Sequence, residues 1–290
     1  MAVDEVRVAG LEYLTLATEL LRRVRVADPE AGLWEAADLQ WWWRTPRRSD
    51  ETDQLFWVDD QGPLAALVLT EWTRGWSCDP IAVPGSPVPL ATVWARALEA
   101  IDRGGLDRVD VLARDDDSEF LALLDDAGYT AGEGEFGITW LDARERPAVA
   151  AVPEGFSLVD RAHGTTAHPM RRRSGDGVEA RLQQCSLYDA TLDLAIETSA
   201  GDVAGYALFW FDPVTQVGLV EPMRVEDEYQ RRGLARALLT TGVDRLWKLG
   251  ARRVKVGYGT DAARALYTAA GFRVTSTSRA YRSAGRPSVG

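Results

Sequence analysis

The segment "YQRRGLARALL", residues 229–239, joins a polar loop to a strongly helical run. The apolar residues that follow recur at the spacing of one helix face, which predicts a helix over 232–249. Gly250 is a suitable stop for that helix. The segment therefore fixes one boundary of the fold, and the neighbouring elements can be placed around it.

The loop before this helix has the chemistry of an anion site. The first turn of a helix leaves backbone N–H groups unpaired, and the helix dipole adds partial positive charge there. Gly233 and Ala235 are small enough to let a diphosphate approach, and Arg231 and Arg232 supply charged donors. Glycine before a helix is also commonplace, so the pattern alone leaves an ordinary loop open as the alternative.

The elements around the helix predict a mostly antiparallel sheet. Three runs separated by turns read as a meander of strands at 191–198, 203–211 and 217–225. After the helix come a strand at 252–259, a short helix ending at Gly271 and a closing strand. The order is β-β-β-α-β-α-β.

Two of these strands are expected to diverge. Pro222 lies inside a strand, where it marks an edge or a bulge, and Gly257 and Gly259 end the next strand. An extended amide could then bind the free backbone near Met223 and Val225. A ligand with a diphosphate at one end and an amide-rich arm at the other is coenzyme A.

Residues 220–272 resemble the core of the GNAT superfamily of N-acetyltransferases. The resemblance rests on the Gln230–Ala235 loop, the strand that leads to Val225, and the Ala-x-x-x-Tyr-x-x-x-Gly-Phe run at 263–272. Many members have Asn where Thr260 stands, which puts one coenzyme contact in doubt, although Thr260 still suits a helix cap. The resemblance implies acetyl-CoA as co-substrate, bound by Met223, Arg224, Val225, Gln230, Arg231, Arg232, Gly233, Leu234, Ala235, Thr260 and Ala263.

Two residues are candidates for catalysis. The resemblance makes Tyr267 the proton donor to the departing thiolate, with simple packing under the sheet as the alternative. Glu221, two residues before Met223 on the same strand, is the candidate base that takes a proton from the amine. An acid followed by proline is equally suited to anchoring the substrate.

The first half of the chain repeats this order more faintly. A hairpin at 55–72, helices at 89–101 and 118–129 and a strand at 108–113 predict a second domain. The proline-containing stretch 147–153 reads as a linker. The expected fold is α/β (α+β), with two tandem GNAT-like domains, each a mixed, mostly antiparallel sheet flanked by helices. Residues 1–146 form the degenerate domain and 154–290 the coenzyme-binding one.

The repeat also predicts what the first domain lacks. If the word "ARAL" at 95–98 is placed on the same word at 235–238, Val93 stands where Gly233 is. The match of "LLDDAGY" to "LYTAAGF" places Leu124 where Tyr267 is. The first domain would then have neither the open loop nor the proton donor.

Composition excludes several classes of protein. The net charge of −11 argues against nucleic acid as the main partner, and no run of apolar residues is long enough for a membrane span. Cys78 and Cys185 lie far apart, and His163 and His168 lack neighbouring ligands, so we expect no metal. A cytoplasmic protein, monomeric or homodimeric, is the default expectation.

Two further segments invite a role. The stretch "WWWRTPRR" (41–48) suggests stacking against nucleic acid, core packing of tryptophans, or the lining of a substrate cleft near Glu221. The basic stretch 168–177 is either an acceptor-facing segment or a solvated loop. The acids at 226–228, beside the anion site, are expected to face solvent.

The resemblance implies transfer of an acetyl group from acetyl-CoA to a primary amine of a small molecule, by direct attack in a ternary complex. Two alternatives remain open. One is a non-catalytic acyl-CoA-binding or sensor module, and the other is an acetyltransferase that acts on a protein N-terminus or lysine.

Overall fold

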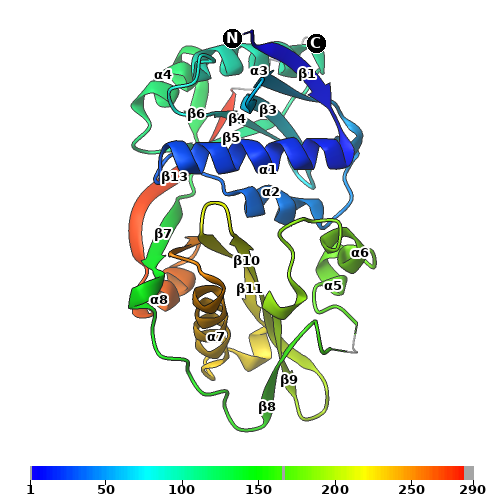
Figure 1. The fold of residues 1–290 in the computed structure, drawn as a ribbon, viewed down its shortest axis with the longest axis vertical. Helices are drawn as coiled ribbons and strands as arrows, with labels where there is room; N and C mark the ends of the chain where they lie inside the picture. Colours follow the sequence, from blue (N-terminus) through cyan, green and yellow to red (C-terminus); the bar gives the residue numbers. More distant parts are fainter. Residues whose placement is uncertain (1, 165–166, 284–290) are drawn as a thin grey trace. The chain divides into compact units, whose positions relative to one another are not determined.

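The computed structural model describes residues 2–164 and 167–283 (Figure 1). The chain divides into two compact units, which are described separately. The N-terminal unit consists of Met1–Leu39, Pro46–Phe136 and Ser276–Gly290, and the C-terminal unit of Gln40–Thr45 and Gly137–Thr275. The two units are interleaved along the sequence, so neither is one continuous half of the chain.

The N-terminal unit contains the larger part of β13 (Arg273–Ser283) and most of the elements that precede β7. In chain order they are β1 (Asp4–Val8), α1 (Gly10–Ala27), the start of α2 (Ala36–Trp43), η1 (Arg48–Glu51), β2 (Gln54–Asp59), β3 (Gly62–Trp72), β4 (Gly75–Ala82), α3 (Leu90–Arg103), β5 (Val109–Arg114), α4 (Ser118–Asp126) and β6 (Tyr129–Ala131).

The C-terminal unit contains the elements expected from the second half of the sequence, and a few more. They are β7 (Phe136–Asp142), η2 (Ala143–Glu145), β8 (Phe156–Asp160), α5 (Arg171–Ser174), α6 (Val178–Leu182), η3 (Ala190–Leu192), β9 (Asp193–Thr198), β10 (Val203–Asp212), β11 (Val217–Val225), η4 (Asp227–Tyr229), α7 (Leu234–Leu249), β12 (Arg253–Tyr258), α8 (Asp261–Ala269) and the start of β13 (Arg273–Ser283).

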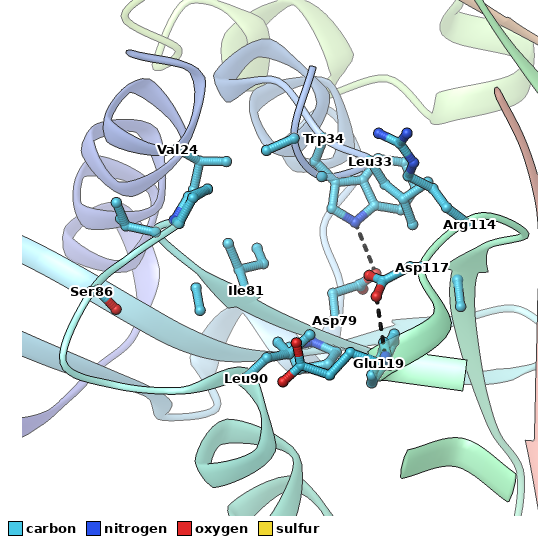
Figure 2. Close-up of a pocket in the computed structure, with 18 of the residues that line it drawn as sticks. Val24, Leu33, Trp34, Asp79, Ile81, Ser86, Leu90, Arg114, Asp117 and Glu119 are labelled. Carbon is cyan, nitrogen blue, oxygen red and sulfur yellow. Dashed lines mark hydrogen bonds between the residues drawn. The ribbon is translucent and has the colours of Figure 1, made fainter. Parts of the chain in front are cut away.

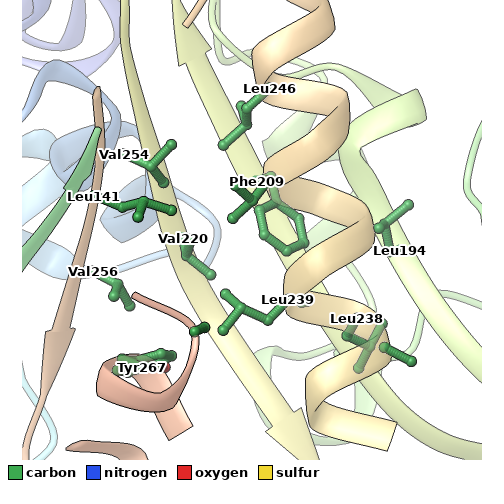
Figure 3. Close-up of a cluster of buried hydrophobic side chains, with 14 of the residues drawn as sticks. Leu141, Leu194, Phe209, Val220, Leu238, Leu239, Leu246, Val254, Val256 and Tyr267 are labelled. Atoms are coloured by element: carbon green, nitrogen blue, oxygen red, sulfur yellow. The ribbon is translucent and has the colours of Figure 1, made fainter. Parts of the chain in front are cut away.

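The C-terminal sheet runs in the order β7-β12-β11-β10-β9-β8. Strands β9, β10 and β11 form the predicted antiparallel meander, and β12 joins β11 in parallel after the crossover through α7. Figure 3 shows Leu239 and Leu246 of α7 directed toward Phe209 and Val220 of the sheet. Leu238 belongs to the same buried cluster and lies on the side of Leu194. The apolar stripe read from the sequence is therefore the stripe that packs.

The N-terminal sheet has the same plan. Its order is β1-β2-β3-β4-β5-β13, and β4 and β5 form its parallel pair. Helix α3 packs Val93, Trp94 and Ala97 into the core of this unit, and α4 adds Phe120 and Leu124. The repeat predicted from the sequence is therefore present in the fold.

The last strand of each sheet comes from the other half of the chain. Strand β7 pairs with β12 through residues 137–142, and β13 pairs with β5 through residues 278–282. The units therefore differ from the expected domains 1–146 and 154–290. Alternating hydrophobicity identifies a strand and its buried face, but it does not say which sheet edge the strand will join.

The expected linker, 147–153, is packed against α7. The backbone N–H of Ala150 donates to the Thr240 hydroxyl at 2.9 Å, and Val152 packs against the core. Just before it, Arg146 pairs with Asp244 at 3.0 Å. This stretch thus fixes one side of the helix whose first turn is the predicted anion site.

The structure corrects the register of the repeat at one helix. Helix α3 begins at Leu90 after Pro89, and α7 begins at Leu234 after Gly233. Matching the helix starts places Pro89 opposite Gly233, one turn away from the match based on "ARAL". The four-letter word misled because Ala, Arg and Leu recur throughout the chain. Leu124 does stand opposite Tyr267 when the caps of α4 and α8 are matched.

Within residues 2–164 and 167–283, no helix combines the length and the apolar content that a membrane crossing requires.

Candidate active site

Strands β11 and β12 diverge as the sequence predicts. Their parallel ladder covers Val217–Leu219 on one strand and Arg253–Lys255 on the other. Beyond it β11 continues to pair only with β10, while β12 pairs with β7 as far as Tyr258. After Leu219 the described residues of β11 and β12 therefore no longer pair with each other. We call the stretch between these two facing backbone edges the slot, because its N–H and C=O groups are where an extended amide would bond.

A bulge in β11 lies at the start of this slot. Ala207 of β10 pairs with Met223 and Phe209 pairs with Val220, so one residue of β10 faces both Glu221 and Pro222. The bond between these two residues is cis. The bulge expected from Pro222 is therefore present.

Trp210, which sequence analysis did not single out, holds this bulge. Its indole N–H donates to the Glu221 carbonyl oxygen at 2.8 Å. Its ring packs edge-on against Tyr188, with 6.3 Å between the ring centroids. A tryptophan in a buried strand resembles any other core residue in the sequence, so no signal marked it.

Gly233 precedes α7 in a left-handed conformation with φ of 85°. The N–H of Ala237 bonds back to the Gly233 carbonyl at 3.1 Å, so the N–H groups of the first turn precede the helical ladder. A Cβ placed on Gly233 would have only Pro153 near it, at 3.8 Å. Glycine thus serves twice here, because it adopts a positive φ and leaves the approach to the helix end open.

The side chains of the loop differ in their availability. Arg231 is exposed and forms no ion pair with any residue that the structure describes. Arg232 donates to the Glu228 carbonyl at 3.2 Å and lies over the Tyr229 ring. Gln230 donates to the Asp227 carboxylate at 3.0 Å. Arg231 is thus the side chain of this loop best placed to meet an incoming anion.

The acidic segment before the loop is only partly solvated. Asp227 and Glu228 are exposed as expected. Glu226 is half-buried and pairs with Arg173 at 2.9 Å and with Arg224 at 3.4 Å. The expectation that all three face solvent was wrong for Glu226, because α5 and β11 each supply a cation. These two cations largely offset the negative charge of Glu226, so it repels an anion at the start of α7 less strongly.

Tyr267 lies on α8 with its ring buried against Phe272, and Figure 3 shows it beside Val256. Burial raises the pKa of its phenol well above the usual value, and the negative charge of Glu221 raises this pKa further. The two predicted catalytic side chains are thus close enough to interact. Among the described residues none accepts a hydrogen bond from the Tyr267 hydroxyl, which leaves its proton for a ligand.

Thr260 caps α8 as predicted, and its hydroxyl accepts a hydrogen bond from the Ala263 N–H at 3.2 Å. Met223 and Val225 are half-exposed and pack against the edge of the core, and Leu234 is buried beneath the loop. Coenzyme contacts of these residues stay predictions.

The segment 168–177 is anchored by a buried polar cluster. The Met170 N–H donates to Nδ1 of His168, so Nε2 of this histidine carries the proton and donates to Asp193 at 2.8 Å. The Tyr188 hydroxyl donates to the same carboxylate oxygen at 2.9 Å. His168 is therefore part of the framework of this segment.

The tryptophans at 41–43 belong to the C-terminal unit. Trp41 and Trp43 are both buried. The Trp43 indole donates to Gln184 at 2.8 Å, and the Arg181 guanidinium lies 3.6 Å from the centre of its ring. This confirms core packing for these two rings, while a role in a substrate cleft stays a prediction.

Comparisons with known proteins agree with this geometry. Residues 166–272 match the model of the acetyltransferase (GNAT) family. A GCN5-related N-acetyltransferase from Sphaerobacter thermophilus has a TM-score of 0.65 and 17% identity, over 97% of this chain and 95% of that one. A tandem GNAT protein from the clavulanic acid biosynthesis pathway has a TM-score of 0.70 and 17% identity, over 99% and 100% of the two chains.

At these identities the solved structures establish the fold, and residues 166–272 are the part of the chain that matches the family model. No curated protein sequence matches the chain.

Proposed function

We propose that this chain is a GNAT-type acetyltransferase with its catalytic domain over residues 166–272, and that it moves an acetyl group from acetyl-CoA to a primary amine of a small molecule. The observation that carries this proposal is the end of the β11–β12 ladder at Leu219, with Glu221 just beyond it on β11 and the open helix start at Gly233. The negative charge of Glu221 also raises the pKa of the buried Tyr267 phenol.

In this proposal the coenzyme lies along the slot with its diphosphate at the start of α7. The N–H groups of the first turn and the exposed Arg231 bind the phosphate oxygens. The free backbone edge of β11 around Met223 and Val225 bonds the amide arm. The open approach at Gly233 and the absence of an internal partner for Arg231 among the described residues support this fit.

The reaction assigns each catalytic side chain one proton. The amine nitrogen attacks the thioester carbonyl, a C–N bond forms and the C–S bond breaks. Glu221 accepts the proton that the amine gives up, and Tyr267 donates a proton to the departing thiolate. The Tyr267 phenol is protonated at neutral pH, as a proton donor must be, and among the described residues none accepts a hydrogen bond from it.

An acyl-CoA-binding sensor is the competing function. Thermal unfolding in the presence of acetyl-CoA, followed by thiol release across a panel of small amines and short peptides, separates the possibilities. An acetyltransferase is stabilised by acetyl-CoA, by about 2.7 kcal/mol at 100 times the dissociation constant, and releases thiol faster when the right amine is added.

Stabilisation without amine-dependent thiol release would indicate a sensor, and peptides outperforming small amines would indicate a protein substrate. An unchanged unfolding temperature with acetyl-CoA would overturn the proposal altogether.

A further inference from the structure

The N-terminal unit contains a pocket of about 370 Å³ (Figure 2). Its walls come from α1, the segment 31–34, the end of β4, the loop that follows it, the end of β5 and the first turn of α4. Apolar side chains line much of it, among them Val24, Leu33, Ile81 and Leu90. Asp79 reaches this pocket from β4.

The pocket occupies the same place in its sheet as the slot between β11 and β12. Strands β4 and β5 pair in parallel at Trp76 and Ser77 and then diverge. Matching this pair to Gly218 and Leu219 on β11 places Asp79-Pro80 where Glu221-Pro222 stands. The two stretches read Asp-Pro-Ile-Ala-Val and Glu-Pro-Met-Arg-Val. The acid at the mouth of the slot is thus retained in the N-terminal unit.

The features that suit a coenzyme are missing there. Pro89 stands before α3, and the loop ahead of it contains Pro84 and Pro87, none of which has a backbone N–H to offer a phosphate. Leu124 replaces the tyrosine and is completely buried. This unit therefore has the acid of the site without its anion-binding loop or its proton donor.

Asp79 is buried and has no cationic partner. Its side chain is 4% exposed and accepts hydrogen bonds from the Trp34 indole at 3.0 Å and from the Ser77 hydroxyl at 3.1 Å. Among the described residues, no lysine, arginine or histidine forms an ion pair with it. Burial raises the pKa of Asp79 to about 6, so the carboxyl is mostly ionised at neutral pH. A buried carboxylate of this kind gains from a cation that enters the pocket.

The charges around the opening also favour a cation. Asp117 and Glu119 line the pocket beside Asp79. Arg114 is the cation among the lining residues, and its guanidinium is paired with Asp116 at 2.7 Å. The lining therefore has a net negative charge, which repels phosphates and attracts ammonium groups.

We propose that this pocket is a second ligand site that binds a small organic amine, with the ammonium group on the Asp79 carboxylate and the apolar body between Ile81, Leu90 and Val24. The site goes beyond the proposed acetyl transfer, because the described residues at the matching positions, Pro89 and Leu124, have neither the open helix start nor the proton donor proposed for acetyl-CoA. The pocket has the carboxylate that matches Glu221, and it lacks the counterparts of Gly233 and Tyr267.

The test uses 2-phenylethylamine and its neutral analogue 2-phenylethanol with the full chain. Calorimetry gives the dissociation constants, and the NMR resonance of the Trp34 indole N–H, assigned with Trp34→Phe, reports on the pocket. We expect the amine to bind about tenfold more tightly than the alcohol and to shift this resonance. In Asp79→Asn the tenfold preference should disappear.

Two variants serve as controls. Asp107→Asn removes one negative charge at an exposed position outside the pocket and should leave the preference intact. Leu90→Trp fills the pocket and should abolish the change that the amine causes in the Trp34 indole N–H resonance. This variant tests the site even if Asp79→Asn does not fold. A preference that survives in Asp79→Asn, or a Trp34 resonance that does not respond to the amine, would overturn the inference. Acetyl-CoA binding is measured separately, so its failure would count only against the acetyltransferase.

Discussion

Two slots in one chain share a scaffold and differ in what they can accept. Both lie where a parallel pair of strands diverges, and both have an acid followed by proline on the first strand. In the C-terminal unit Gly233 precedes the helix after the first of these strands and Tyr267 lies on the next helix, whereas Pro89 and Leu124 stand at these positions in the N-terminal unit. The two units therefore share an arrangement of strands, and under the two proposals above a few residues beside it decide between a coenzyme and a smaller ligand.

The largest effect should come from closing the coenzyme slot. Gly233→Val places a branched side chain at the helix end and removes access to the N–H groups of the first turn. The loss of two hydrogen bonds to phosphate should raise the dissociation constant for acetyl-CoA by about 100-fold. Calorimetry measures this change.

The backbone strain of this substitution needs a matched control. Gly233 has a φ of 85°, so any other residue costs roughly 1–2 kcal/mol there. Gly250, at the other end of α7, has a φ of 106°. Gly250→Val should therefore lower the unfolding temperature similarly and leave acetyl-CoA binding unchanged. Equal loss of binding in both variants would mean that strain, and not access, was responsible.

An effect of similar size, on the rate and not on binding, is expected from removing the proton donor. Tyr267→Phe should lower kcat for the acceptor amine by about 100-fold, because the thiolate then leaves without a positioned acid. Acetyl-CoA affinity should not change, since the ring and its packing are kept. Steady-state thiol release measures the rate.

The comparison variant is Tyr281→Phe, which removes a hydroxyl from β13 in the N-terminal unit. Its rate should equal that of the unaltered protein. If Tyr267→Phe has the kcat of the unaltered protein, Tyr267 serves only in packing and is not the proton donor.

The last prediction concerns stability. The pKa of Asp79 is raised from 3.8 to about 6 in the folded chain, so the folded state holds its proton more tightly than the unfolded one. This carboxyl therefore favours folding below pH 4, and that contribution is lost as the pH rises to 6. The shift corresponds to about 2–3 kcal/mol. Asp79→Asn should gain about this much stability at pH 7 relative to the parent, and much less at pH 4, in urea unfolding monitored at both values.

If the free energy of unfolding depends on pH in the same way in the parent protein and in Asp79→Asn, then Asp79 is not a buried carboxylate without a cationic partner. If only the parent loses stability as the pH rises from 4 to 7, Asp79 carries the cost of a buried carboxylate at neutral pH.

The sequence predicted the C-terminal unit better than the N-terminal one. The meander, α7 and the divergence of β11 from β12 followed from turns, helical periodicity and Pro222. Strand β4 was not predicted, because "GWSCDPIA" neither alternates cleanly nor avoids proline, which usually argues against a strand. The twin of Glu221 therefore went unrecognised.

The candidate site divides in the same way. Gly233 and Tyr267 were identified from local patterns and from the family resemblance. Trp210 and the partners of Glu226 are brought together by pairing between distant segments, and such contacts leave no trace in local spacing. The predicted alignment of α3 with α7 was wrong for a related reason. The four residues "ARAL" recur in the chain by chance, whereas the start of a helix marks its position in the fold.

The exchange of β7 and β13 has a consequence for how the chain can be divided. A cut in the stretch 147–153 would leave β12 without its neighbour on one fragment and β5 without its neighbour on the other. Each fragment would then present a bare strand edge, the kind of surface that pairs with other chains and aggregates. The gene can therefore carry two domains in tandem, yet a working half is not obtained by cutting between them.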